Sequence, residues 1–221
     1  MRAAAPDAID FFRDRFGIDE RSLCSVLGTA LERQIDAADL FFEYSCRDAV
    51  SLEEGIAKTG SRSLEQGFGV RAISGQRQGY AHSDDLSHES LRVAAATARA
   101  IAESGGNPHA LRAPSAAKPA HDLYPVAESP TELPVRRKVE VLAEIDAYAR
   151  GLDPRVQQLM ASLVSEQRIV LICDSEGRLV GDLRPLVRLN VQVIAEAPTS
   201  GRREQAYQGM GGRFELDRVL D

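Results

Sequence analysis

The stretch 66–91, QGFGVRAISGQRQGYAHSDDLSHESL, decides how this chain folds. It begins with an apolar run that contains two glycines, breaks at Ser74-Gly75, and resumes at Gly79-Tyr80-Ala81. Apolar runs separated by a polar, glycine-bearing segment are typical of two strands joined by a turn. Glycine inside a strand marks a bulge or a close approach by another part of the chain. We therefore predict two neighbouring strands joined across residues 74–78.

A helix is predicted to follow these strands. Ser87 is a good N-cap, Glu89 suits the first turn, and apolar residues recur from 91 to 101 before Gly105-Gly106 ends the pattern. An earlier helix is predicted over 21–35, where apolar residues recur at helical spacing.

Two more strands are predicted between these helices. Residues 38–45 (ADLFFEYS) are apolar and aromatic, and residues 49–58 alternate in part. Together with the opening stretch they predict an antiparallel meander of four consecutive strands.

The second half repeats the plan of a helix followed by strands. Pro134 predicts the start of a helix. Strands are predicted over 156–164 and 168–173, with a turn at 175–177. Residues 186–195 alternate apolar and polar side chains, which predicts a sheet with one buried face.

The expected fold class is α+β, with antiparallel sheets, helices on one face, and two halves joined by a proline-rich connector. The predicted division is 1–106, 107–134 and 135–221. The glycines at 209–212 predict a flexible tail, and residues 214–220 look like the first turns of a helix.

Composition argues for an ordinary reduced, cytoplasmic protein. The net charge is −6, from 27 Lys plus Arg against 33 Asp plus Glu, so direct binding to nucleic acid is disfavoured. The 3 cysteines, Cys24, Cys46 and Cys173, form no CxxC pair, which argues against a zinc ribbon or a disulfide framework. The first residues contain no signal peptide, and no apolar run is long enough to span a membrane.

The best candidate metal ligands end the opening stretch: His82, Asp84, Asp85, His88 and Glu89. His88-Glu89 begins a zinc-peptidase pattern, but Arg92 and Val93 stand where the second histidine is needed. Capping and turn chemistry is the alternative for these side chains, and we favour it.

The remaining motifs give no catalytic constellation. Glu53 and Glu54 are adjacent, so on a strand they point to opposite faces. The GMGG at 209–212 lacks the Lys and Ser/Thr of a P-loop, and no serine lies in G-x-S-x-G.

Four segments resemble the TldD branch of the PmbA/TldD family. They are SRSLEQGFGVRAISG with GYAHSDDLS within 61–91, DPRVQQLMASL at 153–163, DLRPLVRLNVQVIAE at 182–196 and GMGGRFE at 209–215. The likeness covers most of the chain from about residue 31, apart from the connector.

The resemblance implies a zinc-dependent peptidase that cleaves unfolded peptides and pairs a TldD-like subunit with a PmbA-like (TldE-like) one. Members also carry the label "modulator of DNA gyrase", which is not evidence of DNA binding. In the family the zinc lies on a His-Glu-x-x-x-His helix of a C-terminal domain. That motif is absent from this sequence, so no metal-binding or catalytic residue is carried over.

The sequence therefore predicts a non-catalytic N-terminal portion of a TldD-like metallopeptidase, which bounds the substrate cleft and supports assembly with a TldE-like subunit or with itself. The alternative is a stand-alone peptide-binding or regulatory module. Arg71 and Arg184 each interrupt an apolar run and are candidates for the peptide cleft, with salt bridging at the edge of the core as their other role.

Overall fold

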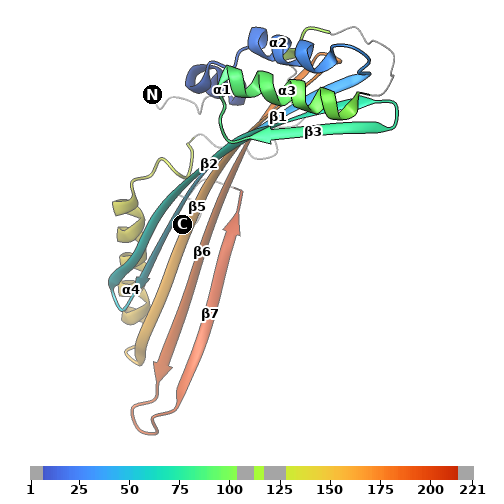
Figure 1. The fold of residues 1–221 in the computed structure, drawn as a ribbon. Coiled ribbons are helices and arrows are strands. Elements are labelled where there is room, and N and C mark those ends of the chain that lie inside the picture. Colours follow the sequence, from blue (N-terminus) through green and yellow to red (C-terminus); the bar gives the residue numbers. More distant parts are fainter. Residues whose placement is uncertain (1–6, 104–111, 117–127, 214–221) are drawn as a thin grey trace.

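The computed structural model describes residues 7–103, 112–116 and 128–213. These residues form one seven-stranded sheet and four helices (Figure 1). The helices are α1 (Ala8–Phe16), α2 (Glu20–Leu31), α3 (His88–Ala102) and α4 (Val135–Leu152). The strands are β1 (Ala37–Glu53), β2 (Ile56–Ser74), β3 (Arg77–Ser83), β4 (Ser115–Ala116), β5 (Val156–Asp174), β6 (Arg178–Glu196) and β7 (Arg203–Gly212).

The sheet joins both halves of the chain. Its order is β3-β2-β1-β5-β6-β4, and β7 also pairs with β6. All pairs are antiparallel except the short parallel contact between β4 and β6. The predicted α+β class with antiparallel pairing is confirmed, and β1 links the halves because it pairs with both β2 and β5.

Several predicted strands are pieces of longer ones. The predicted strand at 38–45 and the start of 49–58 belong to β1, so three strands stand where we predicted a meander of four. In the same way 156–164 and 168–173 are one strand, β5. The turns at 74–78 and 175–177 are confirmed.

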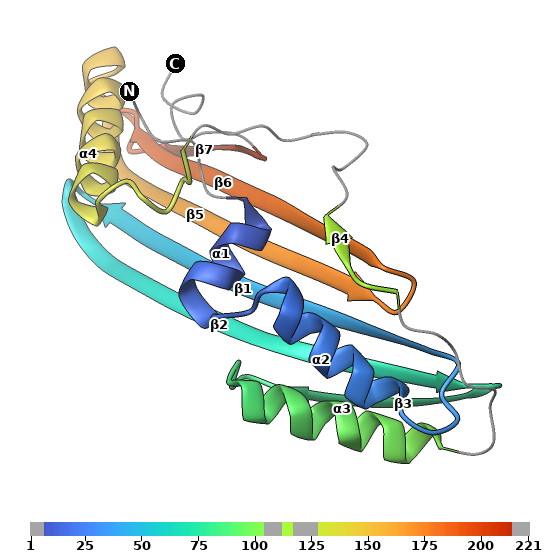
Figure 2. The same ribbon diagram turned by 90° about the horizontal axis from the view of Figure 1, so that it is seen from above.

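All four helices lie on the same face of the sheet. The side chains of β1 that are buried beneath helices occupy even positions throughout. Those at Leu40 and Phe42 belong to the core under α1–α3, and those at Val50 and Leu52 to the core under α4. Because strand side chains alternate between faces, equal parity means one face. Figure 2 shows α1, α2 and α3 together on one side of the strands.

The larger core lies under α1, α2 and α3. The rings of Phe12 and Phe42 are 5.8 Å apart, and those of Phe11 and Tyr44 are 4.9 Å apart. The helix α3 packs very closely on β3, because a Cβ added at Gly79 would lie within 3 Å of the α3 backbone. The predicted N-cap of α3 is present: Ser87 Oγ accepts a hydrogen bond from the backbone N–H of Ser90 at 3.2 Å.

The smaller core lies under α4 and is separated from the larger one by a buried ion pair. The Lys138 ammonium lies 2.6 Å from Asp48 Oδ2 and 2.7 Å from Ser165 Oγ, and the Lys138 and Asp48 side chains are both fully buried. Lys138 comes from α4, Asp48 from β1 and Ser165 from β5, so this contact fixes the helix on the sheet.

The C-terminal prediction is partly wrong. Residues 209–212 form the end of β7, paired with β6, where we predicted a flexible tail. The predicted helix start at 214–220 lies outside the described residues, as does most of the connector at 107–134. The three-part division therefore stays a prediction. In the part of the chain that is described, no helix is both long and apolar enough to cross a membrane.

Candidate functional site

The face of the sheet opposite the helices has no covering layer within the described residues. It carries half-exposed apolar side chains from four strands: Phe41, Tyr80, Ile172 and Leu186. Phe41 and Ile172 are directly paired across β1 and β5, and their exposed fractions are 41% and 38%. A sheet face that mixes apolar side chains with ion pairs suits contact with another polypeptide. We refer to it as the open face.

A recess of about 370 Å³ indents the open face over β2. Its floor is the backbone at Gly67 and Gly69, which bring no side chains. The Tyr80 ring lies over Gly69, where an added Cβ would approach Tyr80 Cε2 to 2.8 Å. Tyr80 and His82 stack with ring centroids 5.7 Å apart. Phe41 also lines the recess, and three carboxylates complete it: Glu43, Glu65 and Asp84.

Both arginines named from the sequence lie on the open face, each paired with an aspartate. Arg71 Nη2 lies 2.7 Å from Asp39 Oδ2, and Arg184 Nε lies 2.5 Å from Asp182 Oδ2. The strand register places Arg71 level with residue 39 of β1 and Arg184 level with Ser45, so the two are not neighbours. Their ion pairs match the salt-bridge alternative, and the cleft role of both stays a prediction.

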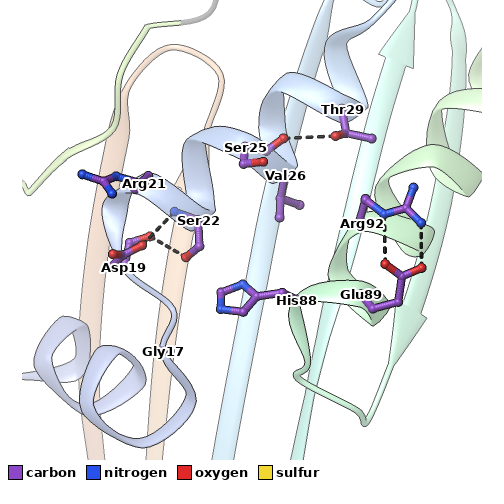
Figure 3. A pocket seen from close by; sticks show the side chains of 10 residues that line it. All are labelled: Gly17, Asp19, Arg21, Ser22, Ser25, Val26, Thr29, His88, Glu89 and Arg92. Carbon is purple, nitrogen blue, oxygen red and sulfur yellow. Dashed lines mark hydrogen bonds and ion pairs between the residues drawn. The ribbon is translucent and has the colours of Figure 1, made fainter.

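A second pocket, of about 550 Å³, lies between α2 and α3 (Figure 3). His88 points from the start of α3 toward Gly17, the residue that ends α1. Arg92 and Glu89 pair with each other at 2.6 Å along α3. Hydroxyls of α2 also line this pocket, but Ser22 and Thr29 donate to backbone carbonyls of their own helix region.

The histidines and carboxylates considered as metal ligands divide between the two pockets. His82 and Asp84 line the recess on the open face, whereas His88 and Glu89 line the pocket between α2 and α3. Asp85 accepts hydrogen bonds from Ser87, which is turn and capping chemistry. Among the described residues no three His, Cys, Asp or Glu side chains are grouped to hold a metal, so these residues do not fit a zinc site.

The cysteines are free in this structure, and Cys46 and Cys173 are buried. Burial raises the pKa of the Cys173 thiol to about 12, with the Asp174 carboxylate adding to the rise. A thiol that stays protonated is a poor nucleophile. Cys173 is therefore a buried core residue of β5.

Sequence reasoning missed the aromatic wall of the recess. The clue was the spacing of Gly67 and Gly69 opposite Tyr80 and His82 in a hairpin with a short turn. In the register, Gly69 pairs with His82, and Tyr80 leans across from its own partner, Arg71. Glycines inside these strands were expected to mark a close approach by another part of the chain. At Gly69 the group that approaches is the Tyr80 ring.

Two family models match the chain. Residues 38–102 match PmbA/TldA metallopeptidase domain 1, and residues 128–221 match the PmbA/TldA metallopeptidase central domain. The first match covers β1, β2, β3 and α3, and the second covers α4 and the strands that follow it.

Curated relatives agree with these models. A protein named metalloprotease TldD homolog from Haemophilus influenzae is 37% identical over 90% of this chain and 41% of its own length. A protein with the same name from Buchnera aphidicola subsp. Acyrthosiphon pisum is 29% identical over 92% of this chain and 41% of its own length. The chain thus spans about two fifths of the length of these relatives.

Solved structures share the fold at low sequence identity. A protein from Thermotoga maritima described as a modulator of DNA gyrase has a TM-score of 0.69 at 12% identity, over 90% of this chain and 44% of its own. TldE from Thermococcus kodakarensis has a TM-score of 0.60 at 16% identity, over 87% of this chain and 43% of its own. With both family models and the TldD homologues in agreement, this chain belongs to the PmbA/TldD metallopeptidase family and corresponds to its N-terminal region.

Proposed function

We propose that this chain is the non-catalytic part of a TldD-like zinc metallopeptidase, and that its open face forms one wall of the cleft for unfolded peptides. The observation that carries the proposal is the one-sided placement of the helices. A sheet with four helices on one face presents a broad surface of half-exposed apolar and paired charged side chains on the other.

Unfolded peptides suit such a surface because they are extended and offer backbone groups at regular spacing. Free strand edges add to this capacity, since an extended peptide can pair with an edge whatever its sequence. β7 pairs only with β6 in the described part of the chain, and residues 56–66 of β2 are exposed along the side that β3 leaves unpaired. Both edges lie next to the open face.

The peptidase chemistry is assigned to residues outside this chain. The described residues do not fit a metal, so the zinc of the family enzyme would be bound elsewhere in a longer protein or in a partner. We propose a TldE-like subunit or a second copy as that partner in the assembly, and the cytoplasm as its location. No step of peptide hydrolysis is assigned to residues of this chain.

The test is to measure binding and cleavage separately. The purified chain is titrated against a fluorescent, unstructured peptide, and cleavage is followed with and without added zinc or a chelator. We expect binding without cleavage. Cleavage that a chelator abolishes would refute the non-catalytic role, and absence of binding would refute the cleft role.

A matched pair of variants locates the bound peptide. Ile172→Ser removes an apolar side chain from the open face, whereas Ile101→Ser removes one from the exposed side of α3. Only the first change is expected to weaken peptide binding. Equal effects would place the peptide elsewhere.

The second candidate function is a stand-alone peptide-binding or regulatory module. The exposed β7 edge favours it, because strand addition needs no catalytic neighbour. Sequencing the gene past the codon for residue 221 discriminates between the two. An in-frame His-Glu-x-x-x-His motif supports the peptidase, and a stop codon supports the module.

A further inference from the structure

We infer that the recess on the open face binds the side chain of an arginine within an extended peptide. This inference rests on the proposed peptide-binding function and adds a preference for one class of side chain. It is carried by the combination of a recess that glycines open, aromatic rings that line it, and carboxylates in the same lining.

The floor of the recess consists of strand backbone at Gly67 and of the Tyr80 ring, which covers Gly69. Gly67 and Gly69 are successive positions of β2 on the open face, and neither projects a side chain there. The flanking strands do project side chains, with Phe41 and Glu43 on β1 and His82 on β3. The result is a recess of about 370 Å³ in which the Tyr80 ring, lying over Gly69, faces the side chains of β1.

The walls match the flat faces of a guanidinium. Tyr80 and His82 stack on one side of the recess, and Phe41 lies on the other. A cation over an aromatic ring is attracted by the ring quadrupole, and arginine makes such contacts more often than lysine. The guanidinium is also planar and weakly hydrated, so it stacks where an ammonium does not.

The charge of the recess is complementary to a cation. Its lining contains the carboxylates of Glu43, Glu65 and Asp84 and no lysine or arginine. Glu43 has one neighbouring cation among its ion pairs in the described structure, Arg168, whose Nε lies 3.7 Å from Glu43 Oε1, while its Nη2 donates to Glu166 at 3.2 Å. Glu43 therefore keeps acceptor capacity for a guanidinium, which can donate two parallel hydrogen bonds to one carboxylate.

We assign arginine as the occupant because its guanidinium can stack on the aromatic rings and donate hydrogen bonds to the carboxylates at the same time. An apolar side chain would make no use of the three carboxylates, and an acidic one would add repulsion. Lysine would satisfy the carboxylates but would use the rings less well. A peptide running beside β2, past the point where β3 ends at Ser83, would place such a side chain over the recess.

The test compares two peptides that differ at one side chain. One unstructured peptide contains a central arginine, and the other contains citrulline, which has nearly the same shape and no charge. Affinities for the full 221-residue chain are measured by fluorescence anisotropy at low salt. We expect the arginine peptide to bind about tenfold more tightly, in keeping with a partly desolvated cation–π contact and a charge-assisted hydrogen bond.

Variants then locate the effect. The double change Glu43→Gln with Asp84→Asn should bring the arginine peptide to the affinity of the citrulline peptide. Glu53→Gln is the matched control, because Glu53 lies ten positions further along the same face of β1, roughly 33 Å away at about 3.3 Å per residue. All these side chains are on the surface, and thermal unfolding checks that each variant is folded.

Each outcome decides a different point. Equal affinity for the two peptides overturns the arginine assignment and leaves peptide binding intact. Failure of both peptides to bind overturns the assignment together with the proposed function. An arginine preference that survives the double change overturns the recess as its site, and so does a preference that Glu53→Gln abolishes.

Discussion

Replacing the buried lysine of α4 by methionine is the sharpest test of how this fold is held together. Lys138 Nζ lies 2.6 Å from Asp48 Oδ2, and both side chains are fully buried. Methionine has a similar length and no charge, so Lys138→Met fills most of the same space. The change removes the hydrogen-bonded partner of Asp48 Oδ2 and leaves the buried carboxylate only the more distant Arg62, whose Nε lies 3.7 Å from Asp48 Oδ1.

The magnitude follows from the burial of both groups. Removing one partner of a buried ion pair lowers stability by about 3–5 kcal/mol. Ser165 also loses the hydrogen bond that it accepts from Lys138 at 2.7 Å, which contributes about 1 kcal/mol. Together these contributions amount to about 4–6 kcal/mol. Because Arg62 remains beside Asp48, we expect the lower end, about 4 kcal/mol, or a fall in Tm of roughly 8–16 °C for a domain of this size.

Urea unfolding followed by circular dichroism measures the loss, with Arg136→Met as the matched control. Arg136 pairs with Glu140 at 3.0 Å on the same helix, but its side chain is 91% exposed. An exposed pair contributes about 0.5 kcal/mol or less. The reasoning is refuted if the free energy of unfolding of Lys138→Met lies within about 1 kcal/mol of the wild-type value, because some exposed ion pairs alone contribute that much.

The single variant Asp48→Asn and the double variant Asp48→Asn with Lys138→Met complete the cycle. The double variant removes both charges, so it should be more stable than Lys138→Met alone by about 2 kcal/mol or more. An additive or larger loss would mean that the two groups are not coupled.

The remaining predictions concern packing and ionisation. Gly79→Ala should lower the free energy of unfolding by about 1–3 kcal/mol, because its Cβ would meet the α3 backbone. Gly75→Ala is the comparison: its Cβ meets no atom within 4 Å but its φ is +59°, so it measures backbone strain without steric overlap. Cys173, with a pKa of about 12, should resist alkylation of the native protein at pH 8, and only unfolding or a rise of pH toward 12 should expose a reactive thiolate; labelling found by mass spectrometry at native pH 8 would contradict its burial. Hydrogen bonds from Arg155 lower the pKa of the exposed Asp153 carboxyl to about 2, so its contribution to stability is present above the ordinary value of 3.8 and is lost only as pH falls through about 2. An NMR titration of Asp153 should show that midpoint, and Arg155→Met should return it toward 3.8.

The elements marked by local chemistry were predictable from the sequence. The turn at 175–177 has its backbone held by the Asp174 carboxylate, and α3 begins at its Ser87 cap. These features depend on neighbours a few residues away, which a single sequence displays directly.

Two elements gave weak sequence signals. β7 is exposed along its length and pairs only with β6 among the described strands, so its sequence lacks the alternation of apolar and polar residues that indicates a strand. α1 went unassigned, although its Asp7 cap and the left-handed Gly17 at its end were both visible in sequence. The glycine spacing hinted at the recess, but its aromatic lining depends on the register that pairs Gly69 with His82 and Arg71 with Tyr80.

The most instructive errors are the false breaks in β1 and β5, because they have one physical cause. We ended strands at Ser45 and at Val164, just before the polar stretches that contain Asp48 and Ser165. The register pairs Asp48 with Ser165, and both contact or receive hydrogen bonds from Lys138. Polar residues inside a strand usually indicate a turn, because their burial is costly without a partner.

Here the partner comes from a helix about 90 residues away in sequence from β1 and 27 from β5, so no local pattern could reveal it. The same ion pair separates the core under α1–α3 from the core under α4, on a sheet that is otherwise continuous. It lets a single set of long strands carry two helical layers while their opposite face stays open. Loss of that pair should therefore free α4 first, and hydrogen exchange in Lys138→Met should rise in α4 before it rises in α3. Uniform exchange in both helices would show that the two cores unfold as one unit.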